Sequence, residues 1–372
     1  MGLKTKNQMS NITYSAVSLF SGAGGLDIGF HKTGRVKSIA CYEFDEIFSE
    51  TLRLNRHCLA VDGECPNIHQ QDLSSAEVLT ELQTSYAGAD IVFGGPPCQS
   101  FSIMGKTLSG IKMGTNDPRG QLVYSFLSVI ENVRPSGFLF ENVPNIVNIE
   151  NGEVVKKLSE AFRSMGYGLW SGIVCAADFG ARTFRRRYII IGIRDMEQVP
   201  APTTTHMKEG LPELFEAPKR PWNSSKSIFE TISEYEIAGR ALANHDKVKH
   251  SEATIERFRQ LKFGETDNIR KRNRIDPSRP AHSVYVGGKV GKLQARTHIH
   301  PYEPRELTAR ECALIQGFPI DWVLSGRADA AVQQAANAVP VELGCGLATH
   351  IVRLLDDGGR VAPHINSKIS VK

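Results

Sequence analysis

The sequence predicts an α/β fold, in which a doubly wound and mostly parallel sheet is joined to a second, smaller domain. Short runs of β-branched and aromatic residues alternate with stretches of helical periodicity over roughly the first 194 residues. Several runs are followed directly by glycine, proline or an acidic residue, as is typical where parallel strands end at the edge of a sheet. After residue 199 the alternation stops and the chain becomes richer in proline, threonine and charge.

The alternation predicts an ordered set of elements. Strands are expected at residues 16–20, 36–42, 91–93, 137–140, 169–175 and 188–193, with a weak further strand just before Asp72. Helices are expected at residues 44–55, 75–82, 121–133 and 152–165, where apolar residues recur every three or four positions. A last helical pattern covers residues 330–355 and is interrupted at residues 337–340.

The run at residues 199–221 lacks a clear period and is typical of a linker. We therefore expect a large domain of residues 1–196 that is completed by residues 320–372. Residues 197–319 are expected to form the smaller domain.

The net charge of +4 conceals an asymmetry along the chain. Residues 182–310 contain 25 Lys and Arg against 16 Asp and Glu, whereas the remainder of the chain contains 19 against 24. A basic excess confined to one segment indicates a polyanionic partner, because lysine and arginine neutralise phosphates.

Seven cysteines form no Cys-x-x-Cys pair, and an odd count in a chain of 372 residues argues against a disulfide framework. We therefore expect a reducing, cytoplasmic compartment. His57, Cys58, Cys65 and His69 have a spacing that matches no familiar zinc site, so no metal is expected. Neither a signal peptide nor a membrane-spanning segment is expected.

Polar groups follow the expected strands one after another. They are the glycine-rich turn at residues 21–25, Glu43, Asp72, Cys98 and Glu141. A glycine turn followed about twenty residues later by an acid suits the ribose of a nucleotide. Asp27 stands where the dinucleotide fingerprint needs Gly or Ala, so a neutral or cationic nucleoside such as S-adenosylmethionine fits better.

Cys98 is the most informative side chain. It lies in the sequence Gly-Gly-Pro-Pro-Cys-Gln-Ser-Phe-Ser at residues 94–102, directly after an apolar run that is typical of a buried strand. Two prolines fix two φ angles, so the thiol is expected to be held at the carboxyl edge of the sheet. The other cysteines fit buried, unreactive positions better.

Taken together, five short motifs in this order resemble those of the DNA cytosine carbon-5 methyltransferases of the restriction-modification type. The motifs are residues 18–25, residues 94–102, Glu141-Asn142-Val143, Arg185-Arg186-Arg187 and residues 337–340. The resemblance covers nearly the whole chain except residues 200–275. It implies the S-adenosylmethionine-dependent methyltransferase fold, with the smaller domain acting in target recognition.

The resemblance assigns catalytic roles that agree with the chemistry. Carbon 5 of cytosine is a poor nucleophile until a group adds to carbon 6, and the Cys98 thiolate would be that group. Glu141 would share a proton with ring nitrogen 3. Arg187, together with Arg185, would hold the carbonyl oxygen of the base or nearby phosphates.

The resemblance also implies a set of residues that bind S-adenosylmethionine, with Phe20 against the adenine or sulfonium, Glu43 on the ribose and Asp72 at the adenine amine. The full expected set is Phe20, Gly22, Ala23, Gly24, Gly25, Glu43, Phe44, Asp72, Leu73, Pro97, Leu122, Asn337 and Val339.

Double-stranded DNA is the implied substrate, with the target base turned out of the helix. We expect residues 101–119 to close over the DNA and basic residues of the smaller domain to read the sequence. The candidates for that reading are Asn244, His245, Lys247, Lys249, His250, Arg257, Arg259, Lys262 and residues 270–274. We expect a monomer, with a cognate restriction endonuclease that acts on the same site without forming a stable complex.

Two alternatives stay open at this point. One is a transfer-RNA cytosine methyltransferase of the same fold, although the Cys-Phe-Thr tripeptide of those relatives is absent. The other is a DNA-binding module without enzymatic activity. The chain also departs from the common family pattern, with Arg182-Thr183 in place of Pro-Gln and Ala336 in place of Gly.

Overall fold

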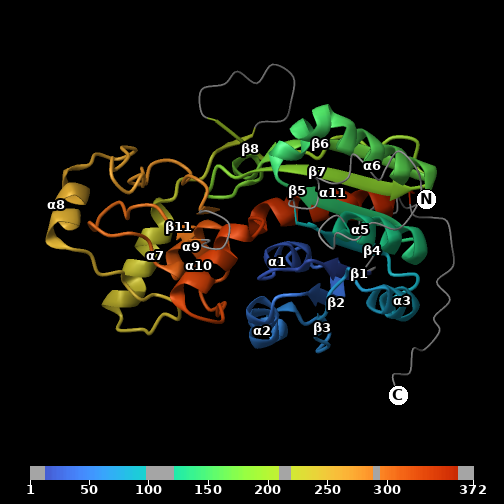
Figure 1. Ribbon diagram of the computed structural model, residues 1–372, viewed down its shortest axis with the longest axis horizontal. Coiled ribbons are helices and arrows are strands. Elements are labelled where there is room, and N and C mark those ends of the chain that lie inside the picture. The colour runs from blue at the N-terminus through green and yellow to red at the C-terminus, as the bar shows by residue number, and fades with distance from the viewer. Residues whose placement is uncertain (1–12, 98–120, 209–218, 288–293, 359–372) are drawn as a thin grey trace, which may run out of the picture.

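The computed structural model describes residues 13–97, 121–208, 219–287 and 294–358. Its centre is a seven-stranded sheet with the strand order β3-β2-β1-β4-β5-β7-β6 (Figure 1). All neighbouring pairs are parallel except those made by β7, which runs antiparallel to both β5 and β6. The strands are β1 (Tyr14–Leu19), β2 (Val36–Glu43), β3 (Asn67–Gln70), β4 (Ile91–Gly94), β5 (Gly137–Asn142), β6 (Tyr167–Cys175) and β7 (Arg186–Arg194).

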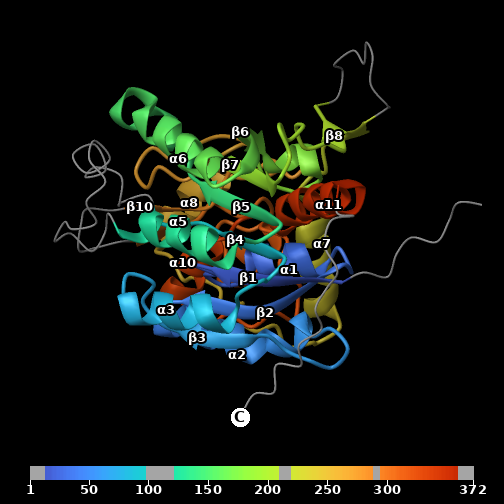
Figure 2. The same cartoon turned by 90° about the vertical axis from the view of Figure 1, so that its right-hand side faces the viewer.

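Helices cover both faces of this sheet. The helices of the described residues are α1 (Gly25–His31), α2 (Glu46–Asn55), α3 (Ala76–Ser85), α5 (Gln121–Val133), α6 (Glu153–Ser164), α7 (Lys226–Ile237), α8 (Glu252–Gln260), α9 (Ala309–Ile315), α10 (Ala328–Asn337) and α11 (Val341–Gly358). Figure 2 shows α3, α5 and α6 on one face and α1 and α11 on the other. The sheet is therefore doubly wound, as the sequence predicts.

Alternation along the strands explains the two layers. In β4, Val92 belongs to the core shared with α5 and α6, whereas Ile91 and Phe93 belong to the core shared with α1 and α11. In β5, Phe138 and Phe140 face the first core and Leu139 faces the second. Because successive side chains of a strand point to opposite faces, these continuous apolar runs are the pattern of strands buried on both sides.

A third core lies beside the sheet and joins α7, α9 and α10. Its largest fully buried side chain is Trp322, and it also includes Ala23 and Ile28 from the region of α1. Two short strands, β10 (Tyr285–Gly287) and β11 (Gln294–Arg296), pair with each other beside α10. Figure 1 shows this part of the chain at one end of the sheet. The strands β8 (His206–Met207) and β9 (Arg220–Pro221) instead lie beside the 3-10 segment that follows β6.

The sequence predicted the strands of the main sheet to within a few residues, and likewise the helices α2, α3, α5, α6, α10 and α11. It did not predict α1, α7, α8 or α9, or the short 3-10 segments η1 (Arg56–Leu59), η3 (Pro144–Gly152) and η4 (Ala176–Phe179). The run at residues 199–221, expected to be a linker, contains β8 and β9, which pair in parallel. Local patterns do not predict two-residue strands, because pairing partners decide them.

The expectation that no segment could span a membrane needs one correction. The span Ala328–Gly358 is long and apolar enough by length and composition, but 72% of its most apolar window is buried inside the structure. These apolar side chains, such as Leu343, Leu347 and Ile351, pack against the sheet. The span therefore serves the core, and no membrane role follows from it.

The contact between α1 and α11 yields a testable prediction. A Cβ on Gly29 would lie 2.8 Å from backbone atoms of Gly344 and Cys345, and backbone cannot move aside as a flexible side chain does. We expect Gly29→Ala to lower the free energy of unfolding by about 1–3 kcal/mol. Urea denaturation would measure this change.

Gly344→Ala is the matched control on the other side of the same contact. Its nearest neighbours would lie at 3.4 Å, an ordinary van der Waals distance. Alanine also favours a helix over glycine, so we expect stability within about 1 kcal/mol of the original. Equal losses in both variants would contradict the assignment of Gly29 as the critical contact.

Candidate functional site

A cavity of about 700 Å³ opens at the carboxyl ends of the parallel strands. Its walls come from the ends of β1, β2, β4 and β5, the start of β7 and the loop before α11. The centre of the cavity lies at β1 and β4, where the strand order reverses and where open α/β sheets bind ligands. This position follows from topology alone.

The structure brings together nearly all the residues that the sequence analysis selected. Those that line the cavity are Phe20, Gly22, Ala23, Gly25, Glu43, Phe44, Asp72, Leu73, Pro97, Leu122, Glu141, Arg185, Arg187, Asn337 and Val339. Gly24 is not among them, since its Cα faces Leu52 and Trp322 in the protein interior. Cys98 and residues 101–119 lie outside the described residues.

Some lining residues were not predicted. Ser18, Ser21, Gly95, Pro96 and Asn142 belong to the motifs but were given no role. Phe48 follows Phe44 by four positions, and this helical spacing of two aromatic residues could have indicated it. No sequence pattern indicates that Gln71 and Gln333 belong to the site. They line the cavity only because the segments that carry them pack beside it.

The glycine turn is held in an unusual backbone conformation. Phe20 and Gly22 have φ angles of 55° and 59°, and Gly24 has 92°. A left-handed φ costs a non-glycine residue such as Phe20 free energy, and such strain is often found at binding sites. A side chain at Gly25 would overlap the carbonyl oxygen of Val339. Position 25 therefore requires glycine, because the glycine turn packs directly against the loop before α11.

Glu43, at the end of the neighbouring strand β2, holds the glycine turn in place by hydrogen bonding. Its Oε2 accepts a hydrogen bond from the amide of Gly22 at 2.7 Å, and its Oε1 accepts one from the amide of Asp45 at 2.9 Å. Burial raises the pKa of Glu43, and the two amide bonds act against that rise. The carboxylate retains lone pairs that can accept hydrogen bonds from a ligand hydroxyl.

Two other expected residues lie at the mouth of the cavity. Asp72 is exposed, and its Oδ1 accepts a hydrogen bond from the amide of Ser74 at 2.8 Å. The Phe44 side chain is 70% exposed. An exposed aromatic ring beside a cavity is available to stack on a flat ligand.

Glu141 and Arg187 form an ion pair at the inner end of the cavity. The Nε of Arg187 lies 2.5 Å from Oε1 of Glu141, and the two side chains are 11% and 12% exposed. β5 and β7 are antiparallel neighbours, so the two residues meet across the ladder near their strand ends. A carboxylate and a guanidinium are thereby presented together at one wall.

Asn142 fixes the loop that leads toward Cys98. Its buried Nδ2 donates to the carbonyl of Pro96 at 2.9 Å. Pro97, which directly precedes Cys98 in the chain, lines the same cavity as Glu141. The proline turn and the ion pair are therefore parts of one site.

Arg185 is fully buried and its terminal nitrogens are already bonded to the protein. Nη1 donates to Val284 at 3.0 Å, and Nη2 donates to Ala336 at 2.5 Å and to Asn337 at 3.2 Å, all at carbonyl oxygens. Only its Nε is without a hydrogen-bond partner among the described residues. Burial lowers the pKa of Arg185, and the guanidinium of Arg187 lowers it further. Arg185 thus joins the start of β7 to two other segments.

The departures from the family pattern also have structural partners. The Nε of Arg182 donates to the hydroxyl of Ser227 at 3.0 Å, and its Nη1 lies 3.7 Å from Oε1 of Glu342. Thr183 pairs with Ala281 in a parallel bridge. The carbonyl of Ala336 accepts from Arg185. These changes therefore affect how segments join.

Many of the basic candidates in the second region are used within the protein. Arg257 pairs with Asp267, Arg272 with Glu306, and Arg274 donates to the carbonyls of Leu261 and Pro301. Others with side-chain partners are Asn244, His245, Lys247, His250, Arg259 and Arg270. Lys249, Lys262 and Lys271 have exposed side chains and are better placed for an external anion.

Metal binding gains no support from the described part of the chain, which contains no group of three or more His, Cys, Asp and Glu placed to hold an ion. His69, one of the residues weighed for zinc, shares a hydrogen bond with the hydroxyl of Tyr86.

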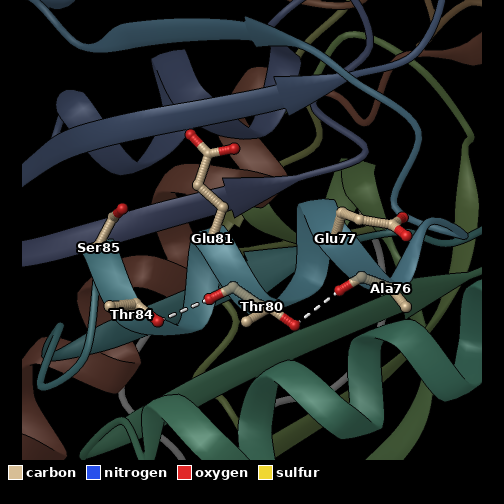
Figure 3. A pocket seen from close by; sticks show the side chains of 6 residues that line it. All are labelled: Ala76, Glu77, Thr80, Glu81, Thr84 and Ser85. Carbon is tan, nitrogen blue, oxygen red and sulfur yellow. Dashed lines mark hydrogen bonds between the residues drawn. The ribbon is translucent and has the colours of Figure 1, made fainter.

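A second hollow lies on the surface of α3 (Figure 3). All six lining residues come from that helix, and the hydroxyls of Thr80 and Thr84 donate to carbonyls one turn earlier. The hollow therefore presents the surface of one helix, with no residue contributed by a second element. The cavity at the sheet edge is the better candidate site.

Nearly the whole chain matches a known protein family. A family model described as C-5 cytosine-specific DNA methylase matches residues 14–353. The Type II methyltransferase M.FnuDI of Fusobacterium nucleatum is 29% identical over 377 residues, covering 95% of this chain and 98% of the relative. The Type II methyltransferase M1.HphI of Haemophilus parahaemolyticus is 29% identical over 358 residues, covering 92% and 87%.

Two solved structures share the fold. One, a prophage-encoded protein of E. coli described as a DNA modification methyltransferase, has a TM-score of 0.67 and 25% identity, covering 92% of this chain and 100% of that one. The other, the Dnmt2 methyltransferase of S. pombe, has a TM-score of 0.61 and 17% identity, covering 93% and 99%. The second likeness concerns the fold alone.

The contact between Gly95 and Glu141 predicts a local change in the site. A Cβ on Gly95 would overlap Oε2 of Glu141, so Gly95→Ala should displace this carboxylate from Arg187. A crystal structure of the variant would measure the separation of Nε and Oε1, which is 2.5 Å here. An ion pair that keeps this distance would show that the loop moves instead, contrary to the prediction.

Proposed function

The chain belongs to the C-5 cytosine-specific DNA methylase family, and on that premise we propose that it methylates carbon 5 of cytosine in a specific duplex DNA sequence with S-adenosylmethionine as donor. The observation that carries the proposal is the shared cavity. The glycine turn, the residue preceding Cys98 and the Glu141–Arg187 pair all line it. A donor and a base bound there would lie side by side.

The cavity residues fit S-adenosylmethionine. The position of a Cβ on Gly22 is open, so a ligand can approach the backbone of the turn. Glu43 offers carboxylate oxygens to ribose hydroxyls, and Phe44 and Phe20 offer aromatic surface. The volume of about 700 Å³ lies within the range of nucleotide-sized sites. When bound, this group supplies an electrophilic methyl on a sulfonium.

The proposed reaction begins at Cys98. Its thiolate adds to carbon 6 of a cytosine turned out of the helix, and the ring becomes an enamine that is nucleophilic at carbon 5. Carbon 5 would then take the methyl group as the bond between that methyl and the sulfonium sulfur breaks, and the sulfur would keep the electron pair as an uncharged thioether. Loss of the proton from carbon 5 and departure of the thiolate restore the aromatic ring and free the enzyme.

Glu141 and Arg187 would act on the base during this addition. Glu141 shares a proton with ring nitrogen 3, which offsets the negative charge that develops as sulfur adds. Arg187 donates to the carbonyl oxygen at position 2, and its planar fork suits a fixed acceptor. We propose that Arg185 supports both by holding the strand start against Ala336 and Asn337.

Recognition of the sequence is assigned to residues 197–319. Three exposed lysines among the candidates of this region, Lys249, Lys262 and Lys271, suit phosphate contacts. Members of restriction-modification systems act with a cognate endonuclease on the same site. We propose this relation here, without a stable complex, for a monomeric protein in the cytoplasm.

The function is tested by methyl transfer from radiolabelled S-adenosylmethionine to duplex DNA, with transfer RNA as the comparison substrate. Bisulfite sequencing of DNA from expressing cells would locate the modified cytosine.

We expect Cys98→Ser to lower the rate of methyl transfer at least about 10³-fold, since the nucleophile is lost, while binding of the donor persists. Substantial residual methylation would exclude the covalent route, and transfer to RNA alone would exclude the DNA substrate.

Glu141→Gln tests the proton shared with ring nitrogen 3. The amide preserves the shape of the side chain but cannot pass a proton, so we expect a fall of about 10²-fold or more in the single-turnover rate. The Kd for S-adenosylmethionine serves as the control and should change little, because Glu43 and not Glu141 accepts the ribose. An unchanged single-turnover rate would remove Glu141 from the proposed role.

A further inference from the structure

Asp27 is a carboxyl group that the proposed reaction leaves unused. It lies in the first turn of α1, directly behind the glycine turn, with 0% of its surface exposed. Its Oδ1 accepts a hydrogen bond from the thiol of Cys41 at 3.2 Å, and its Oδ2 has no hydrogen-bond partner among the described residues. Fully buried carboxylates are rare unless a cation pairs with them.

The groups that face Asp27 are neutral. The β1 strand contributes the hydroxyl of Ser18, and β2 contributes the thiol of Cys41, whose pKa burial raises well above its usual range. On its other side α1 meets α11 at Gly344 and the backbone of Cys345. No salt bridge to Asp27 occurs in the described part of the chain. The carboxyl therefore lacks a counter-ion.

Two polar links connect Asp27 to the cavity. The hydroxyls of Ser18 and Ser21 lie 2.8 Å apart, and both residues line the cavity wall. The hydroxyl of Ser18 faces the Asp27 carboxyl, and the hydroxyl of Ser21 faces the thiol of Cys41, which donates to Asp27. A single layer of hydroxyl and thiol groups thus separates the Asp27 carboxyl from a ligand bound in the cavity. A charge on Asp27 acts across this layer because the protein interior has a low dielectric constant and screens charges poorly.

We propose that Asp27 is a selectivity residue, whose buried carboxylate makes the cavity favour a cationic methyl donor over the uncharged product that methyl transfer leaves behind. This inference rests on the proposed function. S-adenosylmethionine carries one more positive charge than S-adenosylhomocysteine, so the donor alone supplies the missing counter-ion. Once the methyl group is transferred that attraction is lost, which favours product release.

The ionisation of Asp27 gives the proposal a pH signature. Burial raises the pKa of Asp27 to about 6, so the carboxylate is charged at pH 7 and mostly neutral at pH 5. Preference for the donor should therefore fall as the pH is lowered through this range. Glu43 also lines the cavity and burial raises its pKa too, so a variant of Asp27 is needed to separate the two groups.

The test measures the Kd of donor and product by calorimetry at pH 7 and pH 5. The variant is Asp27→Asn, which has the same shape without charge. Asp90→Asn is the matched control, because Asp90 accepts hydrogen bonds from Ser15 beside the start of β4, at the opposite edge of the sheet. An analogue with an ammonium group in place of the methylsulfonium serves as a second cationic ligand.

We expect the ratio of product Kd to donor Kd at pH 7 to be about 3- to 10-fold lower in Asp27→Asn than in the original protein. The original protein should lose the same factor between pH 7 and pH 5, and the ammonium analogue should follow the donor. Asp90→Asn should behave as the original. A general loosening of the site would weaken both ligands together and leave the ratio unchanged.

An unchanged ratio in Asp27→Asn would overturn the proposal, as would equal pH dependence in the variant and the original, which would assign the effect to Glu43. If Asp27→Asn does not fold, Asp27→Ser replaces it as the neutral variant. A ratio in the original protein that stays flat from pH 7 to pH 5 overturns the proposal without any variant. Failure of the original to bind either ligand would instead contradict the proposed donor, and this inference with it.

Discussion

The parallel pairing of β1 with β4 is the constraint on which the rest of the site depends. Leu19 and Gly94 are register partners at the carboxyl ends of these strands, and a side chain at Gly94 would overlap the carbonyl of Leu19. Glycine therefore permits the two backbones to meet at the point where the strand order reverses. The glycine turn leaves one strand and the proline turn leaves the other, so a single pairing brings both to the same cavity.

Three kinds of environment surround the buried charged groups near this cavity. Glu141 and Arg187 neutralise each other at 2.5 Å. Arg185, fully buried, gives its terminal nitrogens to carbonyls of Val284, Ala336 and Asn337. Asp27 accepts one hydrogen bond, from the thiol of Cys41, but has no counter-ion among the described residues, and its Oδ2 has no hydrogen-bond partner there. Burying a charge is costly unless it is paired or hydrogen-bonded, so the exception points to a ligand that completes the balance.

Several features of the molecule could be predicted because they are local. The apolar runs of β4 and β5 predict strands buried on both faces, and glycine or proline marks their ends. The five motifs supply more than half of the residues that line the cavity, because four of the motifs lie at strand termini on the same side of the sheet. Gly24 is an exception: its neighbours in the motif line the cavity, but its own Cα faces Trp322, which is 298 positions later in the chain.

By itself the sequence determined the doubly wound sheet, most of the helices that cover it and the residues that gather at its carboxyl edge, because periodicity and turn chemistry act over a few neighbouring residues. Tertiary structure alone decided which charges are paired. Arg185 and Arg187 are equivalent in the sequence, yet one donates to carbonyls of distant segments and the other meets Glu141 across the antiparallel ladder. Asp27 is likewise an ordinary first-turn acid until α1 is packed onto the sheet. Burial and pairing arise only when segments far apart in the chain are brought into contact, and no local pattern contains that information.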